Sequence, residues 1–165
     1  MLTNSVPSSL YPCIGIEYAL RTLIECTKEA YQHERFKEFC KGRDYLSIIK
    51  EMCTIRVAGP RMAGHTTAML KCAQECERPA IITYSITVED DLRKYHPEAV
   101  KLKNAVWASS YNFKTALRGC TLDAIFVDMA SFVSKTKQDE IAVIASACGA
   151  YQIGSGKSFL LVFLQ

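Results

Sequence analysis

The chain has 165 residues, of which 49% are hydrophobic and 22% are charged, and its formal net charge is +3. A chain of this length is expected to form one domain with a sizeable core, and this composition excludes wholesale disorder. The weak positive charge allows contact with nucleic acid but does not predict it, because dedicated binders carry a strong, clustered excess of Lys and Arg. No run of about twenty apolar residues occurs, so a membrane span is not expected.

The cysteines and the start of the chain indicate a compartment. Eight cysteines are scattered through helix-like and strand-like patterns, which is typical of free thiols in a reducing environment rather than of a disulfide framework. Residues 1–12 have no basic start followed by an apolar run, as a standard signal peptide would. We therefore expect a cytoplasmic protein.

The first fifty residues predict helices. Apolar residues recur at helical spacing from Ile16 to Ile24, with charged residues between them. A further helix is expected from about Tyr45 to Met52, after a break at Gly42. Because the charges of this segment nearly cancel, we interpret residues 1–52 as a helical layer that packs on the rest of the protein, not as a nucleic-acid-binding face.

From residue 53 onward, strand-like and helix-like segments alternate. Strands are expected over residues 53–58, 79–85, 104–108, 122–129 and 159–164. Helices are expected over residues 66–76, 88–95 and 138–148, with Gly149 as a C-terminal cap, and a helical turn over 113–118. The alternation predicts a three-layer α/β fold with a mostly parallel central sheet. We expect one P-loop-like domain over residues 1–165, with the nucleotide-binding core at 53–165.

A glycine-containing loop follows the first expected strand and precedes a helix. The loop and the first helical residues are Gly59-Pro60-Arg61-Met62-Ala63-Gly64-His65-Thr66-Thr67. The backbone N–H groups of such a loop and the N-terminus of the next helix form an anion site that suits triphosphate oxygens. Thr66 stands where the Ser or Thr of a phosphate loop ligates Mg²⁺. We predict a P-loop that binds a nucleotide, and an ordinary strand–turn–helix is the alternative.

His65 is the departure from that motif, because it stands where a phosphate loop has its lysine. Imidazole is shorter than a lysine side chain and carries only a fractional charge near pH 7. Arg61 lies inside the loop and would restore a permanent positive charge.

A second acidic motif follows in the correct order. The apolar run at residues 122–127 ends in Asp128. An aspartate in this position holds Mg²⁺, usually through water, opposite the threonine of the loop. We therefore predict Thr66 and Asp128 as a metal pair; the alternative is that Asp128 caps a turn.

Residues 116–132 resemble the segment around the second acidic motif in the ATPase core of phage large terminases, which package DNA. There the pattern is an Arg-Gly pair, a strand, Asp-Glu-Ala and an aromatic residue, and this chain has Arg118-Gly119, a strand, Asp128-Met129-Ala130 and Phe132. The loop at 60–67 is similar to the phosphate loop of that family, which carries an early arginine. The similarity covers roughly residues 53–165, without the nuclease domain of full packaging motors.

This resemblance implies ATP and Mg²⁺ as cofactors, DNA as a partner, and a role for Arg61 in phosphate sensing or catalysis. It also implies the host cytoplasm as the location of a phage-encoded protein. Motors of this type place catalytic groups at subunit interfaces, so a homo-oligomer is a further expectation. Gln165 follows the last expected strand, where a polar sensor commonly contacts the γ-phosphate.

Met129 departs from the family, because it stands where the family has the glutamate that polarises the attacking water. The changes at His65 and Met129 remove a phosphate clamp and a general base. Other acids are available for the second role, and the sequence does not place them: Glu89, Asp90, Asp91, Asp139 and Glu140.

Two functions therefore stay open. One is an ATPase that hydrolyses ATP with Mg²⁺ and acts with DNA. The other is a degenerate P-loop protein that acts as a binding or regulatory module through protein partners. A small kinase is disfavoured, because such kinases keep the lysine and add an arginine-rich lid.

Two further patterns are interpreted as structural. Residues 154–158, Gly-Ser-Gly-Lys-Ser, look like a second phosphate loop, but Tyr151 replaces the required earlier glycine and a strand follows. We interpret them as a connection before the last strand. Cys72 and Cys76 lie one helical turn apart, and we expect core thiols because no other Cys or His pair has ligand spacing.

Four other positions are of interest. His33 and His96 are expected at the surface or as caps, and Trp107 is expected in the core. The pair Tyr84-Ser85 ends an expected strand, and ligands of α/β sheets bind beyond such ends, so contact with a ligand is an alternative there.

Overall fold

The structure is a computed structural model that describes residues 11–60 and 63–165. At its centre is a sheet of five strands: β1 (Thr54–Val57), β2 (Pro79–Thr83), β3 (Val106–Ser109), β4 (Ala124–Val127) and β5 (Leu160–Leu164). The strands lie in the order β1-β5-β4-β2-β3, and every neighbouring pair is parallel. The predicted α/β fold with a mostly parallel sheet is confirmed.

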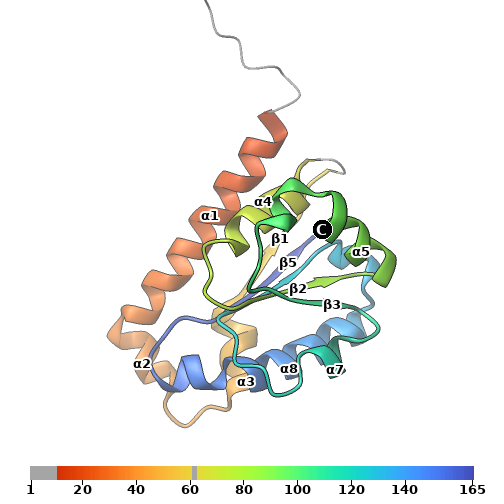
Figure 1. The fold of residues 1–165 in the computed structure, drawn as a ribbon. Coiled ribbons are helices and arrows are strands. Elements are labelled where there is room, and N and C mark those ends of the chain that lie inside the picture. Colours follow the sequence, from red (N-terminus) through yellow and green to blue (C-terminus); the bar gives the residue numbers. More distant parts are fainter. Residues whose placement is uncertain (1–10, 61–62) are drawn as a thin grey trace, which may run out of the picture.

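Helices cover both faces of the sheet, which gives three layers (Figure 1). The α-helices are α1 (Tyr11–Gln32), α2 (Glu34–Cys40), α3 (Tyr45–Ile48), α4 (His65–Ala73), α5 (Ile86–Tyr95), α6 (Pro97–Val100), α7 (Phe113–Ala116) and α8 (Lys135–Gly154). A π-helical turn, η2 (Ile49–Cys53), continues α3, and a 3₁₀ turn, η3 (Ala130–Phe132), follows β4. No helix within the described ranges has both the length and the apolar composition to span a membrane.

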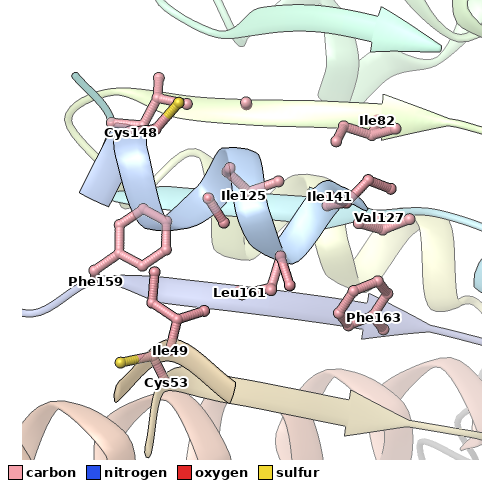
Figure 2. Packing of buried hydrophobic residues seen from close by; sticks show 14 of the residues in the cluster. Ile49, Cys53, Ile82, Ile125, Val127, Ile141, Cys148, Phe159, Leu161 and Phe163 are labelled. Atoms are coloured by element: carbon pink, nitrogen blue, oxygen red, sulfur yellow. The ribbon is translucent and has the colours of Figure 1, made fainter. Parts of the chain in front are cut away.

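The sheet is buried because its strands carry apolar residues on both faces. All four residues of β4 are buried. Ile125 and Val127 pack on the side of α8, whereas Ala124 and Phe126 pack on the side of α4. Figure 2 shows the first side, with residues of β4 and β5 against Ile141 of α8. Continuous burial of this kind is what a parallel strand between two helical layers requires.

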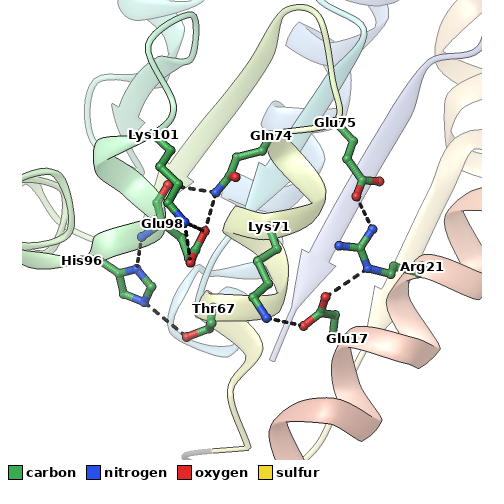
Figure 3. Close-up of polar contacts among 9 residues, drawn as sticks. All are labelled: Glu17, Arg21, Thr67, Lys71, Gln74, Glu75, His96, Glu98 and Lys101. Atoms are coloured by element: carbon green, nitrogen blue, oxygen red, sulfur yellow. Dashed lines mark hydrogen bonds and ion pairs between the residues drawn. The ribbon is translucent and has the colours of Figure 1, made fainter.

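Of the N-terminal helices, α1 packs on α4, whereas residues of α2 and α3 pack on the side of α8. Glu17 of α1 accepts hydrogen bonds from Lys71 of α4 at 2.7 Å and from Arg21 at 3.1 Å. The hydrogen bond from Lys71 is the main reason why the pKa of Glu17 lies below its usual value. Arg21 also pairs with Glu75, so that two ion pairs join α1 to the α4 segment (Figure 3).

Several element boundaries differ from the predictions, and three of these differences are described here with their local context. The first strand begins at Thr54, because the helical segment that begins at Tyr45 continues through η2 to Cys53. Strand β4 ends at Val127, so that Asp128 lies just beyond it. Helix α5 begins at Ile86, because the Ser85 side chain accepts a hydrogen bond from the Val88 N–H at 3.3 Å and caps the helix.

Gly149 was predicted to end a helix, and this prediction is wrong. Helix α8 continues past it to Gly154, and Ser155 caps its C-terminal end. A Cβ atom on Gly149 would lie 2.6 Å from a ring atom of Phe159. The glycine is therefore needed for the close approach of α8 to the residue before β5, and not to stop the helix. Residues 155–159 connect α8 to β5, as the interpretation of the Gly-Ser-Gly-Lys-Ser segment expects.

Gly149→Ala is expected to lower the free energy of unfolding by about 1–3 kcal/mol, because the added methyl group overpacks the Phe159 ring. Gly15→Ala is the matched control, since Gly15 lies in α1 with nothing within 4 Å of its Cβ position. That change should raise the free energy of unfolding by about 0.5–1 kcal/mol through helix propensity alone. Urea unfolding followed by circular dichroism measures both, and equal stabilisation of the two variants would contradict the packing argument.

The remaining structural predictions have mixed outcomes. His33 caps α2 and His96 caps α6, as predicted. Cys72 is buried, and Cys76 is partly buried with its thiol directed to the Cys72 carbonyl oxygen at 3.7 Å. Trp107 is only partly buried, because β3 lies at the edge of the sheet.

Candidate functional site

A cavity of about 600 Å³ lies at the carboxyl edge of the sheet. One wall comes from the loop after β1 and the start of α4, namely Gly59, Gly64, His65, Thr66 and Thr67. The other wall comes from the segments at the ends of β4 and β5, namely Asp128, Met129, Ser131, Phe132, Leu164 and Gln165. Because all strands are parallel, these segments meet at one edge, where ligands of α/β sheets bind.

The two predicted metal residues are in direct contact across this cavity. The Thr66 hydroxyl donates to the Asp128 carboxylate, whose two oxygens lie 2.9 and 3.1 Å from Thr66 Oγ1. Thr66 is in the first turn of α4, and Asp128 follows β4. Strand β5 separates β1 from β4, so the contact joins two segments that lie on either side of the end of β5.

Asp128 is a buried carboxyl with little compensation of its charge. It is 2% exposed, and desolvation raises its pKa above the usual value. The hydrogen bonds from the Thr66 hydroxyl and from the Met129 N–H, at 3.0 Å, act in the opposite direction. Among the described residues, no Lys or Arg forms an ion pair with Asp128. A buried carboxylate of this kind favours a nearby cation.

The backbone around the loop explains its two glycines. Gly64 caps α4 with φ +83°, in the left-handed region that favours glycine. A Cβ atom on Gly59 would lie 3.0 Å from His65 Nε2 and 3.2 Å from Ile16 Cδ1. Gly59 therefore allows the His65 ring to lie against the start of the loop, beside a side chain of α1.

The His65 ring leaves one polar atom without a partner. Its Nε2 is buried and has no hydrogen-bond partner within the described part of the protein. Buried polar atoms are normally satisfied, and exceptions often mark a site for a ligand, ion or water. Because His65 also lines the cavity, an anionic oxygen bound at the loop would satisfy this atom in its protonated form.

The predicted loop residues are only partly assembled at the cavity. Gly59, Gly64, His65, Thr66 and Thr67 line it. Pro60 and Ala63 belong to the loop, where the Ala63 N–H donates to the Pro60 carbonyl at 3.2 Å, but they are not among the lining residues. Arg61 and Met62 lie outside the described residues.

Met129 adopts an unusual backbone conformation beside Asp128. Its φ is +52°, the only positive value at a described residue other than glycine. Such a conformation costs roughly 1 kcal/mol or more and is common at functional sites. Met129 lines the cavity at the position where the resemblance expects a catalytic glutamate.

The other candidate acids lie elsewhere. Asp128 is the one Asp or Glu among the described residues that line the cavity. Glu89 pairs with Arg93, Asp139 with Lys135, and Glu140 with Lys114. Asp90 and Asp91 are exposed on α5 and do not line the cavity either.

The edge of the cavity includes residues that the motifs did not indicate, namely Ser131 and Leu164. The sequence could have indicated them only through their positions, since Ser131 follows β4 closely and Leu164 ends β5. Tyr84 does not line the cavity, but its ring centre lies 5.6 Å from that of the lining residue Phe132. Ser85 caps helix α5.

The backbone of Gln165 joins the two walls of the cavity. Its N–H donates to the Val57 carbonyl, and its carbonyl accepts from the Gly59 N–H.

No family model matches this chain, and no curated protein matches it either.

Proposed function

We propose that the chain binds a nucleoside triphosphate, with ATP as the expected nucleotide, together with Mg²⁺. The observation that carries the proposal is the contact between Thr66 and Asp128, which lie 62 residues apart in the chain. The two residues that the sequence predicts as a metal pair meet at one cavity. The parallel sheet brings both segments to one edge, but an ordinary strand–turn–helix and an isolated turn cap do not require a hydrogen bond between them.

The residues of the site suit both parts of such a ligand. The first turn of α4 offers N–H groups and the positive end of a helix to phosphate oxygens. His65 Nε2 is one further donor for an anion. Thr66 and Asp128 supply the oxygen atoms that Mg²⁺ prefers, and the bound ion would neutralise charge on the phosphates. The raised pKa of Asp128 supports this assignment, because a cation would offset the cost of its burial.

We infer that hydrolysis is slow in the isolated chain. Asp128 is the one Asp or Glu among the described lining residues, and its oxygens already accept hydrogen bonds from Thr66 and Met129. The described lining residues therefore include no second acidic side chain that could act as a general base toward water. This observation favours the second candidate function, a nucleotide-binding module that acts through protein partners. An ATPase that acts with DNA, as in terminase motors, is proposed from the resemblance alone, and a neighbouring copy would then supply the base.

Calorimetric titration with a non-hydrolysable ATP analogue tests the proposal. With Mg²⁺ present, the unmodified chain should bind the analogue with a Kd in the micromolar range, and chelation of Mg²⁺ should weaken binding at least roughly tenfold. Thr66→Val should remove the Mg²⁺-dependent part of binding. Thr22→Val is the matched control, because Thr22 is an exposed helical threonine of α1. Absence of binding at millimolar analogue, or equal binding by the two variants, would refute the proposed site.

A further inference from the structure

His96 makes two hydrogen bonds that join the cavity to a neighbouring helix. Its Nδ1 accepts from the Glu98 N–H at 3.2 Å and so caps α6. Its Nε2 lies 3.2 Å from the hydroxyl oxygen of Thr67, the second threonine of α4 (Figure 3). Thr67 lines the cavity, whereas His96 does not.

The cap fixes which ring nitrogen carries the proton. Because Nδ1 accepts a hydrogen bond, the neutral ring must carry its hydrogen on Nε2. Nε2 is therefore the donor in the bond to Thr67, and Thr67 Oγ1 is the acceptor. The direction of this bond follows from the local structure of α6.

The Thr67 hydroxyl then keeps its own proton for another acceptor. Helical threonines commonly donate to the carbonyl oxygen one turn earlier, as Thr22 and Thr27 of α1 do at 2.9 and 2.8 Å. Thr67 makes no such bond to a described residue, and His96 is its hydroxyl partner. A hydroxyl that accepts from an imidazole N–H is polarised toward donating its proton.

We propose that His96 is a positioning residue of the nucleotide site: it orients the Thr67 side chain so that the hydroxyl donates to an anionic oxygen of the ligand. This inference rests on the proposed function, since the oxygen belongs to a phosphate group at the start of α4. It adds a donor that the phosphate-loop motif does not specify, in a loop where histidine replaces the usual lysine.

A polar network holds His96 in place. The Glu98 carboxylate accepts from Gln74 of the α4 segment at 2.7 Å and from Lys101 at 3.0 Å (Figure 3). The hydrogen bond from Gln74 is the first reason why the pKa of Glu98 lies below its usual value. Gln74 Nε2 also donates to the Glu98 backbone carbonyl at 3.1 Å. The segment that carries His96 is thus attached to α4 at its C-terminal end as well as at Thr67.

His96→Asn separates the two roles of the ring. Asparagine is among the best N-cap residues, so the cap of α6 should survive, but its side chain is too short to reach Thr67. We expect an unchanged Tm and a roughly 3- to 10-fold weaker affinity for the Mg²⁺-bound ATP analogue, as for the loss of one hydrogen bond. Thr67→Val should weaken affinity to a similar degree, and the double variant should lose no more than either single variant.

His33→Asn is the matched control. His33 caps α2 in the same way, with its Nδ1 accepting from the Arg35 N–H at 3.2 Å, but it forms no hydrogen bond with a described residue that lines the cavity. This variant should bind the analogue as tightly as the unmodified chain. Nitrogen-15 NMR of the imidazole rings gives a readout that needs no ligand: His96 should carry its proton on Nε2.

The outcomes distinguish this inference from the proposed function. If the unmodified chain binds the analogue and His96→Asn binds it with equal affinity, the positioning role is overturned and the proposed function is left intact. Additive losses in the double variant, or a proton on Nδ1 of His96, also overturn it. Absence of binding by the unmodified chain overturns both. Coupled losses with an unchanged Tm, and an unaffected His33→Asn, support the inference.

Discussion

Asp128→Asn is expected to stabilise the metal-free protein at pH 7 and to abolish the Mg²⁺-dependent part of nucleotide binding. Asparagine has nearly the same shape and still accepts from the Thr66 hydroxyl and the Met129 N–H. It carries no charge, so the desolvation that raises the pKa of Asp128 no longer opposes folding. A gain of about 1 kcal/mol in the free energy of unfolding is expected, which is usual when a functional group that costs stability is replaced.

The pH dependence of stability follows from the direction of this pKa shift. The folded carboxyl has a higher pKa than its ordinary value of 3.8, so the folded state holds the Asp128 proton more tightly than the unfolded chain does. The contribution of Asp128 to stability is therefore lost as pH rises from near 3.8 through the pKa of the folded state. Asp128→Asn should remove this part of the pH dependence. The free energy of unfolding of the variant should exceed that of the unmodified chain by an amount that grows across this pH range and is constant above it.

Urea unfolding at several pH values, with and without Mg²⁺, measures both effects. Asp91→Asn is the control, because Asp91 is exposed on α5 and is not among the cavity residues. In Asp128→Asn, added Mg²⁺ should no longer stabilise the protein in the presence of nucleotide, and Mg²⁺-dependent affinity should fall at least about tenfold. If Asp128→Asn has a lower free energy of unfolding than the unmodified chain when both are measured without Mg²⁺, Asp128 has a structural role.

The sheet could be predicted because each strand can be recognised from its own residues. Strands such as Pro79–Thr83 and Ala124–Val127 are buried on both faces, so they appear in the sequence as continuous apolar runs between helical patterns. Parallel strands bring their carboxyl ends to one edge, so the sequence could place Thr66 and Asp128 at the same edge, whereas their contact also depends on the strand order β1-β5-β4, which the sequence did not predict.

The features that could not be predicted depend on contacts between distant segments. Gly149 has the local signature of a helix end, but it lies inside α8, where the ring of Phe159, ten residues later in the chain, packs against it. The contact of His96 with Thr67 depends on the corner between α5 and α6, which no local pattern describes. The position of His65 Nε2 beside Gly59 likewise depends on how the loop folds, and a motif comparison at position 65 alone does not reveal that this atom is buried.

Met129→Glu is expected to raise Mg²⁺-dependent ATP hydrolysis by about 100-fold or more, because a positioned general base contributes about 10²–10⁴-fold. Met129 follows Asp128 directly and lines the cavity. Its left-handed backbone is strained for methionine and for glutamate alike, and its N–H bond to Asp128 does not depend on the side chain. The substitution should therefore add a carboxylate without changing the fold.

Met129→Gln is the matched control, since glutamine has the shape of glutamate but no basic carboxylate. Phosphate release measures turnover, and calorimetry with the ATP analogue shows whether both variants still bind. Faster turnover in Met129→Glu alone would mean that the site is an ATPase core that lacks only its base. Equal, slow turnover with intact binding would show that the missing carboxylate at position 129 is not what limits hydrolysis. In that case the chain is better described as a module that binds nucleotide and passes the signal to a protein partner.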